Sequence, residues 1–279
     1  MGFPLEHFWL PSLPSPAMCR LLAYQGIPQS LDRLIAQPEH SLIVQSYQPR
    51  EMTAGVINAD GFGIGWYHPD RSTDPFIYKH TQPIWTDINL PHLSRYVETG
   101  CMLSYVRSAT LGQAVSLSNC QPFQDGKLLF IHNGFIDKFR SGLYRQIRDK
   151  LHHHIYQAID GTTDSEHIFA LFSNELHTHP ELPLEIALGR TLQLLRDLVE
   201  AERTTLTANI VISDGERLIA SRFAHRATVP SLYWIKNSID YPDSVILASE
   251  PIFAGNWQTC PMQSIITVSK DLEIEIQSI

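Results

Sequence analysis

The sequence lacks several features that would assign it to a protein class at once. Its four cysteines, Cys19, Cys101, Cys120 and Cys260, form no C-x-x-C pair. This excludes zinc-ribbon and thioredoxin-type motifs. In a reducing compartment we expect these cysteines to remain thiols. No apolar run reaches the length of a membrane-spanning helix, so we predict no membrane association.

Basic residues are also scarce. The chain has 21 Lys and Arg against 29 Asp and Glu, which gives a net charge of −8, and no stripe of Lys or Arg offsets it. Nucleic-acid binding normally requires a basic face, so a nucleic-acid partner is not expected. Hydrophobic residues make up 43% of the 279 residues, enough for one large globular domain.

The N-terminal segment does not have the pattern of a secretion signal. Residues 1–17 have no positively charged start, and Glu6 and four prolines interrupt the apolar stretch. We therefore expect a cytoplasmic protein. Because the segment has no periodicity, residues 1–18 are predicted to be an extension, either a mis-assigned start or a removed piece. Residues 19–279 are predicted to form one domain.

Signatures of metals and nucleotides are absent as well. The triplet at residues 152–154 is all histidine, but no cysteine or clustered carboxylate stands near it at ligand spacing. The glycines of residues 61–65 lack the following helix and the Lys-Ser/Thr pair of a phosphate-binding loop. We predict no metal and no cofactor.

The predicted elements come in the order strands, helices, strands. Thr163 to Glu166 fits a helix capping box, with apolar residues following at helical spacing, and residues 184–201 form a second amphipathic helix. Strands are predicted at residues 19–24, 61–67, 101–107, 128–132, 207–213, 217–223, 232–236, 245–249, 264–269 and 272–276. Without strict alternation of strand and helix, this order favours antiparallel sheets layered with helices, an α+β fold.

Certain short motifs contain residue types that are costly in a core and common in active sites. They are Met18-Cys19-Arg20, Asn58-Ala59-Asp60-Gly61-Phe62-Gly63, Arg107-Ser108-Ala109-Thr110, His132-Asn133-Gly134 and Thr163-Asp164-Ser165-Glu166. Each alone has an ordinary structural explanation. Cysteine is often buried, Asn-Gly is a common turn, and aspartate is common in a first helical turn.

Together, in this order and spacing, the motifs resemble the class II glutamine amidotransferases over most of the chain from Cys19 onward. Within that family the sequence is most similar to the stand-alone γ-glutamyl hydrolases of ergothioneine biosynthesis. The segments that carry this similarity are MCRLLAY, SLIVQSYQPR, NADGFG, RSAT and ASEP. The resemblance implies a four-layer αββα sandwich of antiparallel sheets, the N-terminal-nucleophile hydrolase fold.

The resemblance also implies a catalytic set. Cys19 would be the nucleophile, with its own α-amino group as the base, which requires Cys19 to be the first residue of the active protein. The Asn133 side chain and the Gly134 backbone N–H would stabilise the oxyanion. One departure concerns Gln121, because relatives often have histidine there, and a glutamine cannot hold a proton in the same way.

The remaining implied residues bind the glutamyl head group. Arg107 would clamp its α-carboxylate through two parallel hydrogen bonds, and Asp164 would accept from its α-ammonium group. Thr110 would add a hydroxyl nearby. Since the glutaminase fold uses nearly all the residues after Cys19, no ammonia-using synthase domain is expected within the chain.

We therefore predict a cysteine amidohydrolase that cleaves a γ-glutamyl amide bond of a small molecule and releases glutamate. The resemblance favours γ-glutamyl-hercynylcysteine S-oxide, whose trimethylammonium group an aromatic side chain could bind. Candidate aromatics are Trp66, Tyr67, Trp85, Tyr233 and Trp257. Alternatives are a glutaminase that feeds ammonia to a separate partner, a glutathione-type γ-glutamyl peptide hydrolase, and a non-catalytic domain of the same fold. The oligomeric state is not predicted.

Overall fold

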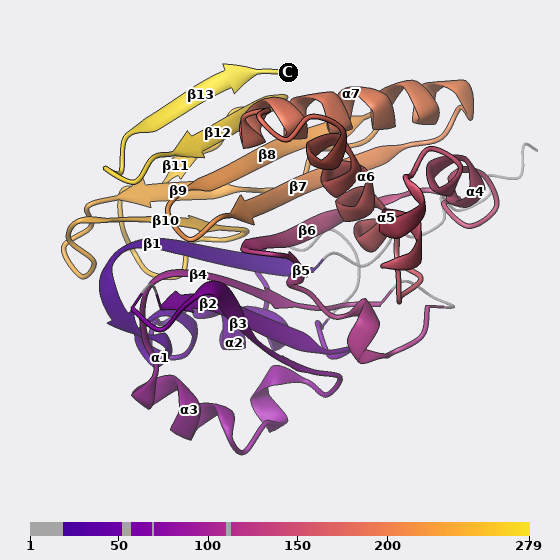
Figure 1. Ribbon diagram of the computed structural model, residues 1–279. Helices are drawn as coiled ribbons and strands as arrows, with labels where there is room; N and C mark the ends of the chain where they lie inside the picture. Colours follow the sequence, from indigo (N-terminus) through magenta and orange to yellow (C-terminus); the bar gives the residue numbers. More distant parts are fainter. Residues whose placement is uncertain (1–18, 52–56, 69, 110–112) are drawn as a thin grey trace, which may run out of the picture.

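The computed structural model describes residues 19–51, 57–68, 70–109 and 113–279. Two antiparallel sheets face each other in its centre (Figure 1). Sheet A contains, in spatial order, β11 (Gln258–Thr259), β9 (Tyr233–Lys236), β10 (Ser244–Ala248), β1 (Arg20–Ser30), β4 (Glu98–Val106), β2 (Phe62–His68) and β3 (Ser72–His80). Sheet B contains β13 (Ile274–Ser278), β12 (Ser264–Val268), β8 (Leu218–His225), β7 (Leu206–Ser213), β6 (Leu128–Ile136) and β5 (Phe123–Asp125).

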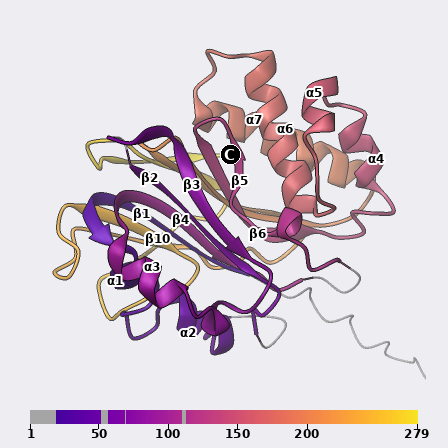
Figure 2. The same ribbon diagram turned by 60° about the horizontal axis from the view of Figure 1, so that its bottom comes forward.

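Helices cover the outer faces of both sheets, and Figure 2 shows the two helical groups on opposite sides of the molecule. The sheet A side has α1 (Leu31–Ile35), α2 (Leu42–Tyr47) and α3 (Leu90–Tyr96). The sheet B side has α4 (Leu143–Arg148), α5 (His153–Gln157), α6 (Asp164–Thr178) and α7 (Leu184–Ala201). Short 3-10 helices lie at Ile84–Thr86 and Leu117–Asn119. This arrangement confirms the predicted four-layer αββα sandwich.

Alternation along the strands produces this layering. In β1, Leu21 and Ala23 pack between the two sheets, whereas Leu22 and Tyr24 pack under the helices of sheet A. Successive strand side chains point to opposite faces, so a fully apolar strand can serve two cores at once. Residues 21–24 of β1 therefore contribute to both cores.

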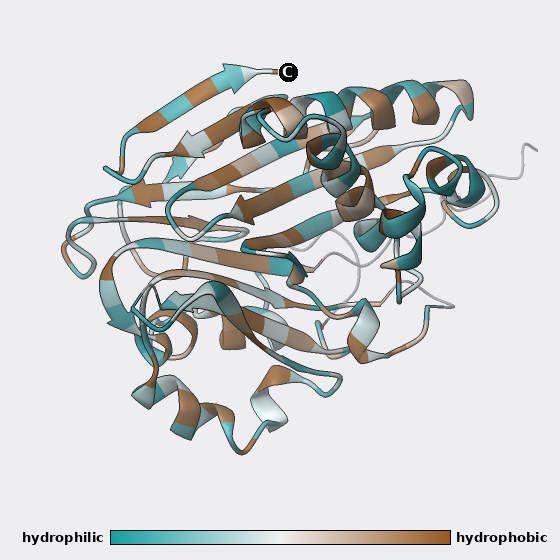
Figure 3. Ribbon diagram, in the orientation of Figure 1, coloured by the Kyte–Doolittle hydropathy of each residue, from teal (hydrophilic) through white to brown (hydrophobic). Residues whose placement is uncertain are grey.

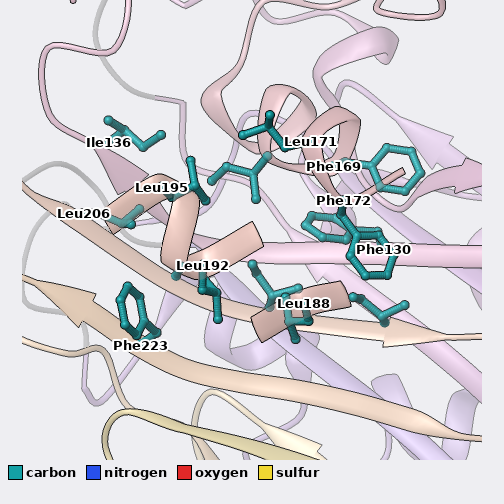
Figure 4. Packing of buried hydrophobic residues seen from close by; sticks show 14 of the residues in the cluster. Phe130, Ile136, Phe169, Leu171, Phe172, Leu188, Leu192, Leu195, Leu206 and Phe223 are labelled. Atoms are coloured by element: carbon teal, nitrogen blue, oxygen red, sulfur yellow. The ribbon is translucent and has the colours of Figure 1, made fainter. Parts of the chain in front are cut away.

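The largest core lies between sheet B and its helices. Leu188, Leu192 and Leu195 of α7 share one buried cluster with Phe223 and Leu206 of the sheet, and Figure 4 shows these side chains. Apolar and polar residues alternate along α7 in Figure 3, as expected for a helix with one buried stripe. No helix in the described part of the chain combines the length and apolar character needed to cross a bilayer.

The N-terminus of α6 differs in one detail from the predicted capping box. The Thr163 side chain accepts a hydrogen bond from the Glu166 backbone N–H, at 3.2 Å, as expected of an N-cap. Glu166, however, accepts from the backbone N–H groups of Asp160 and Gly161, both at 2.9 Å, rather than from Thr163. The glutamate thereby fixes the loop that leads into the helix.

Candidate active site

Cys19 stands immediately before β1, and strand pairing places it beside a predicted substrate-binding segment. β1 pairs with β4 in a register that sets Arg20 opposite Val106, the last residue of β4. The residues that follow, Arg107 and Ser108, consequently lie next to Cys19. The Ser108 backbone N–H donates to the Cys19 sulfur at 3.3 Å, and the thiol lies 3.5 Å from the Ser108 carbonyl oxygen.

The surroundings of Cys19 leave its thiol in need of a base. The side chain is only 8% exposed, and this burial raises the pKa of the thiol. The Tyr105 hydroxyl, the Ser108 backbone and the positive charges of Arg107 and Arg20 act in the opposite direction without overcoming burial. A thiol held protonated in this way becomes a nucleophile only when a neighbouring group takes its proton.

Arg107 is buried at the end of β4 with neutral partners. Its Nη1 donates to the carbonyl oxygens of Asp60, at 3.4 Å, and Ala114, at 3.3 Å, while Nη2 donates to the Gln113 side chain at 3.2 Å. Among the described residues, no carboxylate forms an ion pair with this guanidinium. Its charge is therefore available for an anionic group such as a carboxylate.

Asp60 adjoins the candidate site, although it was not among the residues predicted from the sequence. Its Oδ2 accepts from the Ala109 backbone N–H at 2.7 Å, and its own N–H donates to the Arg107 carbonyl oxygen at 3.0 Å. The motif at residues 58–63 thus binds the backbone of residues 107–109 through Asp60. The adjacent Gly61 has φ +119°, a conformation that favours glycine, and an added Cβ would lie 2.6 Å from the Cys120 sulfur.

Asn133 reaches the same region from the opposite sheet. It lies on β6, and β6 of sheet B faces β1 of sheet A (Figure 1). Its Nδ2 donates to the Ser249 hydroxyl over a long 3.5 Å, and that hydroxyl accepts from the Leu21 backbone N–H at 3.0 Å. Since an amide carries two N–H bonds, this side chain keeps a donor free near the first residues of β1.

Gly134 is required by packing between strands. An ideal Cβ at this position would lie 2.0 Å from the carbonyl oxygen of Thr207 on β7 and 2.5 Å from the His132 ring. Neighbouring backbone occupies the space that any side chain would need. The lack of a side chain here is therefore explained by the β6–β7 pair, independently of any substrate.

Asp164 joins the start of α6 to the end of β6. Its Oδ2 accepts from the Ile136 backbone N–H at 2.8 Å and its Oδ1 from the Ser165 backbone N–H at 2.9 Å. Burial raises the pKa of Tyr105, and the charges of both Cys19 and Asp164 add to that rise. Tyr105 therefore lies within electrostatic reach of both residues. Thr110, the remaining predicted head-group residue, lies outside the described residues.

His132 is held as a neutral ring. Its Nε2 lies 3.1 Å from the Thr207 carbonyl oxygen, which can only accept, so Nε2 carries the proton. Its Nδ1 then accepts from the Ser165 hydroxyl at 2.9 Å. Burial lowers the pKa of this histidine, which keeps the ring uncharged.

The Gln121 side chain has a structural role in this protein. Its Oε1 accepts from the His132 backbone N–H at 2.5 Å, and its Nε2 donates to the His132 carbonyl oxygen at 3.1 Å. The side-chain amide thus pairs with β6 as a neighbouring peptide group would. This pairing occupies both ends of the amide and accounts for a glutamine at this position.

The structure therefore brings Cys19, Arg107, Asn133 and Asp164 into one region and adds Asp60, Tyr105 and Ser249. Asp60 lies in a motif that signalled a site without indicating its partner. No group of three or more His, Cys, Asp or Glu side chains in the described ranges is arranged to hold a metal ion.

Comparison with known proteins identifies similar chains. The family described as class II glutamine amidotransferases matches residues 18–237. A γ-glutamyl-hercynylcysteine sulfoxide hydrolase of Mycolicibacterium smegmatis is 31% identical over 90% of this chain and 96% of its own length. A probable glutamine amidotransferase of Saccharomyces cerevisiae, DUG3, is 29% identical over 91% of this chain and 82% of its own length.

A solved structure supports the fold. The glutamine aminotransferase class-II domain protein of Silicibacter pomeroyi superposes with a TM-score of 0.68, covering 94% of this chain and 99% of its own, at 24% sequence identity. At that identity the likeness concerns the arrangement of layers and strands rather than the reaction.

Proposed function

The chain belongs to the class II glutamine amidotransferases, and we propose that it hydrolyses a γ-glutamyl amide through Cys19. Its proposed substrate is γ-glutamyl-hercynylcysteine S-oxide. The observation that carries the proposal is the position of the Cys19 thiol beside the Ser108 backbone, while the Asn133 amide of the facing sheet reaches the start of β1 through Ser249, which binds Leu21. The name of the mycolicibacterial relative, similar over nearly its full length, supports the substrate.

In this proposal, binding at two charged groups orients the glutamyl head. The Arg107 guanidinium binds the α-carboxylate, and Asp164 accepts from the α-ammonium group. Arg107 suits this role because its present partners are neutral oxygens, which a carboxylate outcompetes. Thr110, at the end of the same segment, is proposed to add a hydroxyl.

The proposed reaction passes through a thioester. The free α-amino group of Cys19, with a reference pKa of about 8, takes the thiol proton as sulfur attacks the amide carbon. The Asn133 Nδ2 and the Gly134 backbone N–H donate to the resulting oxyanion. The protonated amine then gives its proton to the leaving nitrogen, and water hydrolyses the thioester to release glutamate. This sequence requires an active protein that begins at Cys19.

Tyr233 is the proposed contact for the trimethylammonium group. Tyr67 is buried, with its hydroxyl bound to the Lys127 and Ser213 carbonyl oxygens. Trp66, Trp85 and Trp257 pack against Phe76, Tyr47 and Phe253, respectively.

The Tyr233 hydroxyl instead lies 2.9 Å from both carboxylate oxygens of Glu51. The Glu51 backbone N–H donates to Glu250, which binds Arg20 beside Cys19. An aromatic face next to a carboxylate suits a quaternary ammonium ion.

The substrate proposal is tested by glutamate release from protein whose intact mass shows that it begins at Cys19. γ-Glutamyl-hercynylcysteine S-oxide, glutathione and L-glutamine are compared at equal concentrations, with Cys19→Ala as the inactive control. We expect the first compound to have the highest kcat/KM. A clear preference for glutamine would support a glutaminase instead. Release from none of the three compounds would overturn the proposal.

Tyr233 variants test the ammonium contact. Tyr233→Ala should lower kcat/KM for γ-glutamyl-hercynylcysteine S-oxide by about 5-fold and leave that for glutamine unchanged, because only the first compound carries the cation. Tyr233→Phe, which keeps the ring, is the matched variant and should retain most of the selectivity. Equal losses on both compounds would remove Tyr233 from the proposed cation site.

A further inference from the structure

We propose that Glu250 and Arg20 are positioning residues that hold the Cys19 nucleophile in place. This inference rests on Cys19 being the nucleophile, as proposed above. Arg20 and Glu250 are each 1% exposed, and Nε of the arginine lies 2.7 Å from Oε1 of the glutamate. The pair joins the first strand to a residue 230 positions later in the chain.

The Glu250 carboxylate is fixed from four directions. Oε1 accepts from Arg20 Nε and, at 3.0 Å, from the Glu51 backbone N–H. Oε2 accepts from His40 Nε2 at 2.6 Å and from the Arg50 backbone N–H at 2.8 Å. A carboxylate with four donors cannot rotate without breaking one of these hydrogen bonds, so it presents Arg20 with an acceptor of fixed orientation.

The other arm of Arg20 binds the nucleophile's own peptide group. Nη1 donates to the Cys19 carbonyl oxygen at 2.9 Å. The carbonyl carbon of Cys19 is bonded to the same Cα that carries its amine and its thiol side chain, so holding the carbonyl restricts where the reacting groups can lie. An ion pair that served only the core would not need a hydrogen bond to Cys19.

The preceding residue extends the same control to the proposed oxyanion donor. Ser249 exchanges two hydrogen bonds with Leu21: its hydroxyl accepts from the Leu21 N–H, and its own N–H donates to the Leu21 carbonyl oxygen at 3.0 Å. The same hydroxyl receives Asn133 Nδ2. The dipeptide Ser249-Glu250 therefore sets the separation between Cys19 and Asn133, which come from different sheets.

The energetics of buried ions favour this role over simple stabilisation. Removing two charges from water costs about as much as their attraction returns, so a buried pair adds little stability compared with apolar residues of similar volume. What the charged pair provides and apolar side chains do not is directional contact with a chosen backbone atom.

The test compares single and paired substitutions in protein that begins at Cys19. Glu250→Gln removes the carboxylate charge, and the double variant Arg20→Met with Glu250→Gln removes both charges and leaves no buried ion unpaired. Arg20→Lys keeps a charge but offers one nitrogen where two are used. Glu200→Gln is the matched control, since Glu200 also accepts from a histidine, His225, at 2.6 Å, but lies on the exposed side of α7.

Two measurements are made on each variant: kcat and KM, and the rate at which iodoacetamide alkylates Cys19, followed by peptide mass. We expect Glu250→Gln, Arg20→Lys and the double variant to lose about 10-fold or more in kcat with little change in KM, because misplacement of a reacting atom affects the chemical step. Cys19 alkylation should slow in the same variants, and Glu200→Gln should behave as the unmodified protein.

The double variant decides the matter if the single variants fold poorly. A folded double variant with unchanged kcat and alkylation rate would show that the pair only fills the core, and it would overturn the proposal. Alkylation needs no γ-glutamyl compound. Slower alkylation in a protein that hydrolyses none of the tested compounds would therefore support the positioning role while the substrate proposal fails.

Discussion

The two sheets hold their parts of the site by different kinds of contact. On the sheet A side, the ion pair of Arg20 with Glu250 secures Cys19, and Glu250 in turn accepts a hydrogen bond from His40. On the sheet B side, neutral groups hold the strand next to Asn133, as His132 bonds to Ser165 and Thr207, and the Asp164 carboxylate contacts this strand only at its last residue, Ile136. Cys19 precedes its strand, and the ion pair fixes its orientation. Asn133 lies inside a strand, where the backbone hydrogen bonds of the neighbouring residues already fix its position.

The proposed nucleophile is where we expect the largest effect. A chain that keeps residues 1–18 has a peptide nitrogen at Cys19 in place of an amine, and it should turn over about 1,000-fold more slowly than a chain that begins at Cys19, because general-base catalysis is lost. Intact mass and turnover measured on the same sample check this. Full activity in protein shown to retain Met1 would contradict the mechanism.

On the sheet B side, Asn133→Ala should lower kcat by about 100-fold or more through loss of an oxyanion donor. Asn209→Ala is the matched control, since Asn209 is the buried residue directly opposite Asn133 on β7. Both variants should lose stability in thermal unfolding, but only Asn133→Ala should lose turnover to this extent. Comparable turnover losses in the two would place the effect in the strand pair and not in the reaction.

A smaller loss is expected where the head group binds. Arg107→Lys retains the charge but not the two-pronged geometry, so kcat/KM should fall by about 10-fold or more, in line with a charge-assisted hydrogen bond of about 1.5–3 kcal/mol. Arg190→Lys, at an exposed ion pair with Glu175, serves as control. Unchanged kinetics in Arg107→Lys would remove this residue from the proposed clamp.

The two sides should also differ in how acid destabilises them. Burial lowers the pKa of His167 to about 4, while its ring donates to the Thr163 carbonyl oxygen and accepts from Arg148. A lowered histidine pKa gives stability that is present above the unfolded value of about 6.5 and is lost as the pH falls toward 4. The loss from this residue at pH 5 should be about 2 kcal/mol, and His132 adds to it in the same direction.

On the sheet A side, the corresponding loss of stability occurs at lower pH. Burial opposes the charge of Glu250, but Arg20, His40 and two backbone N–H groups hold the pKa of this carboxyl below its usual value. Its contribution is therefore present above about pH 4.3 and is lost as the pH falls further.

Urea unfolding at pH 7 and pH 5 tests the difference between the two sides. In His167→Gln the free energy of unfolding should change less between these pH values than in the unmodified protein. In His92→Gln, at an exposed position, it should change as much as in the unmodified protein. If the free energy of unfolding of His167→Gln falls between pH 7 and pH 5 as much as that of the unmodified protein, the acid-dependent loss does not come from His167.

Much of the fold follows from periodicity in the sequence. The long helices α6 and α7 and the apolar strands β1, β4, β6 and β7 were predicted because each carries a clear pattern. β3 was not predicted, since Asp74 and Pro75 interrupt its apolar residues, and a proline is acceptable there because β3 lies at the edge of sheet A.

The predicted site is less complete than the predicted fold. The order of the motifs predicted that Cys19 and Arg107 belong to one site. In the structure, the pairing register of β1 and β4 places them side by side. The hydrogen-bond partners of Asp60 and Glu250 could not be predicted from the sequence. These bonds join residues 49 and 230 positions apart, and contacts at such separations produce no periodic pattern. For Gly134 the glycine itself was noted, but its packing against Thr207 became visible only with β7 in place.

The central position of β1 between β4 and β10 has a consequence for the timing of synthesis. Cys19 leaves the ribosome before Ser249 and Glu250, which bind the first residues of β1 from 228 and 230 positions further along the chain. A growing chain therefore carries the Cys19 thiol before its contacts through Ser249 and Glu250 can form. Catalytic competence should arise late and in one step, when β10 inserts beside β1, so incomplete chains should be inert toward the cell's γ-glutamyl compounds.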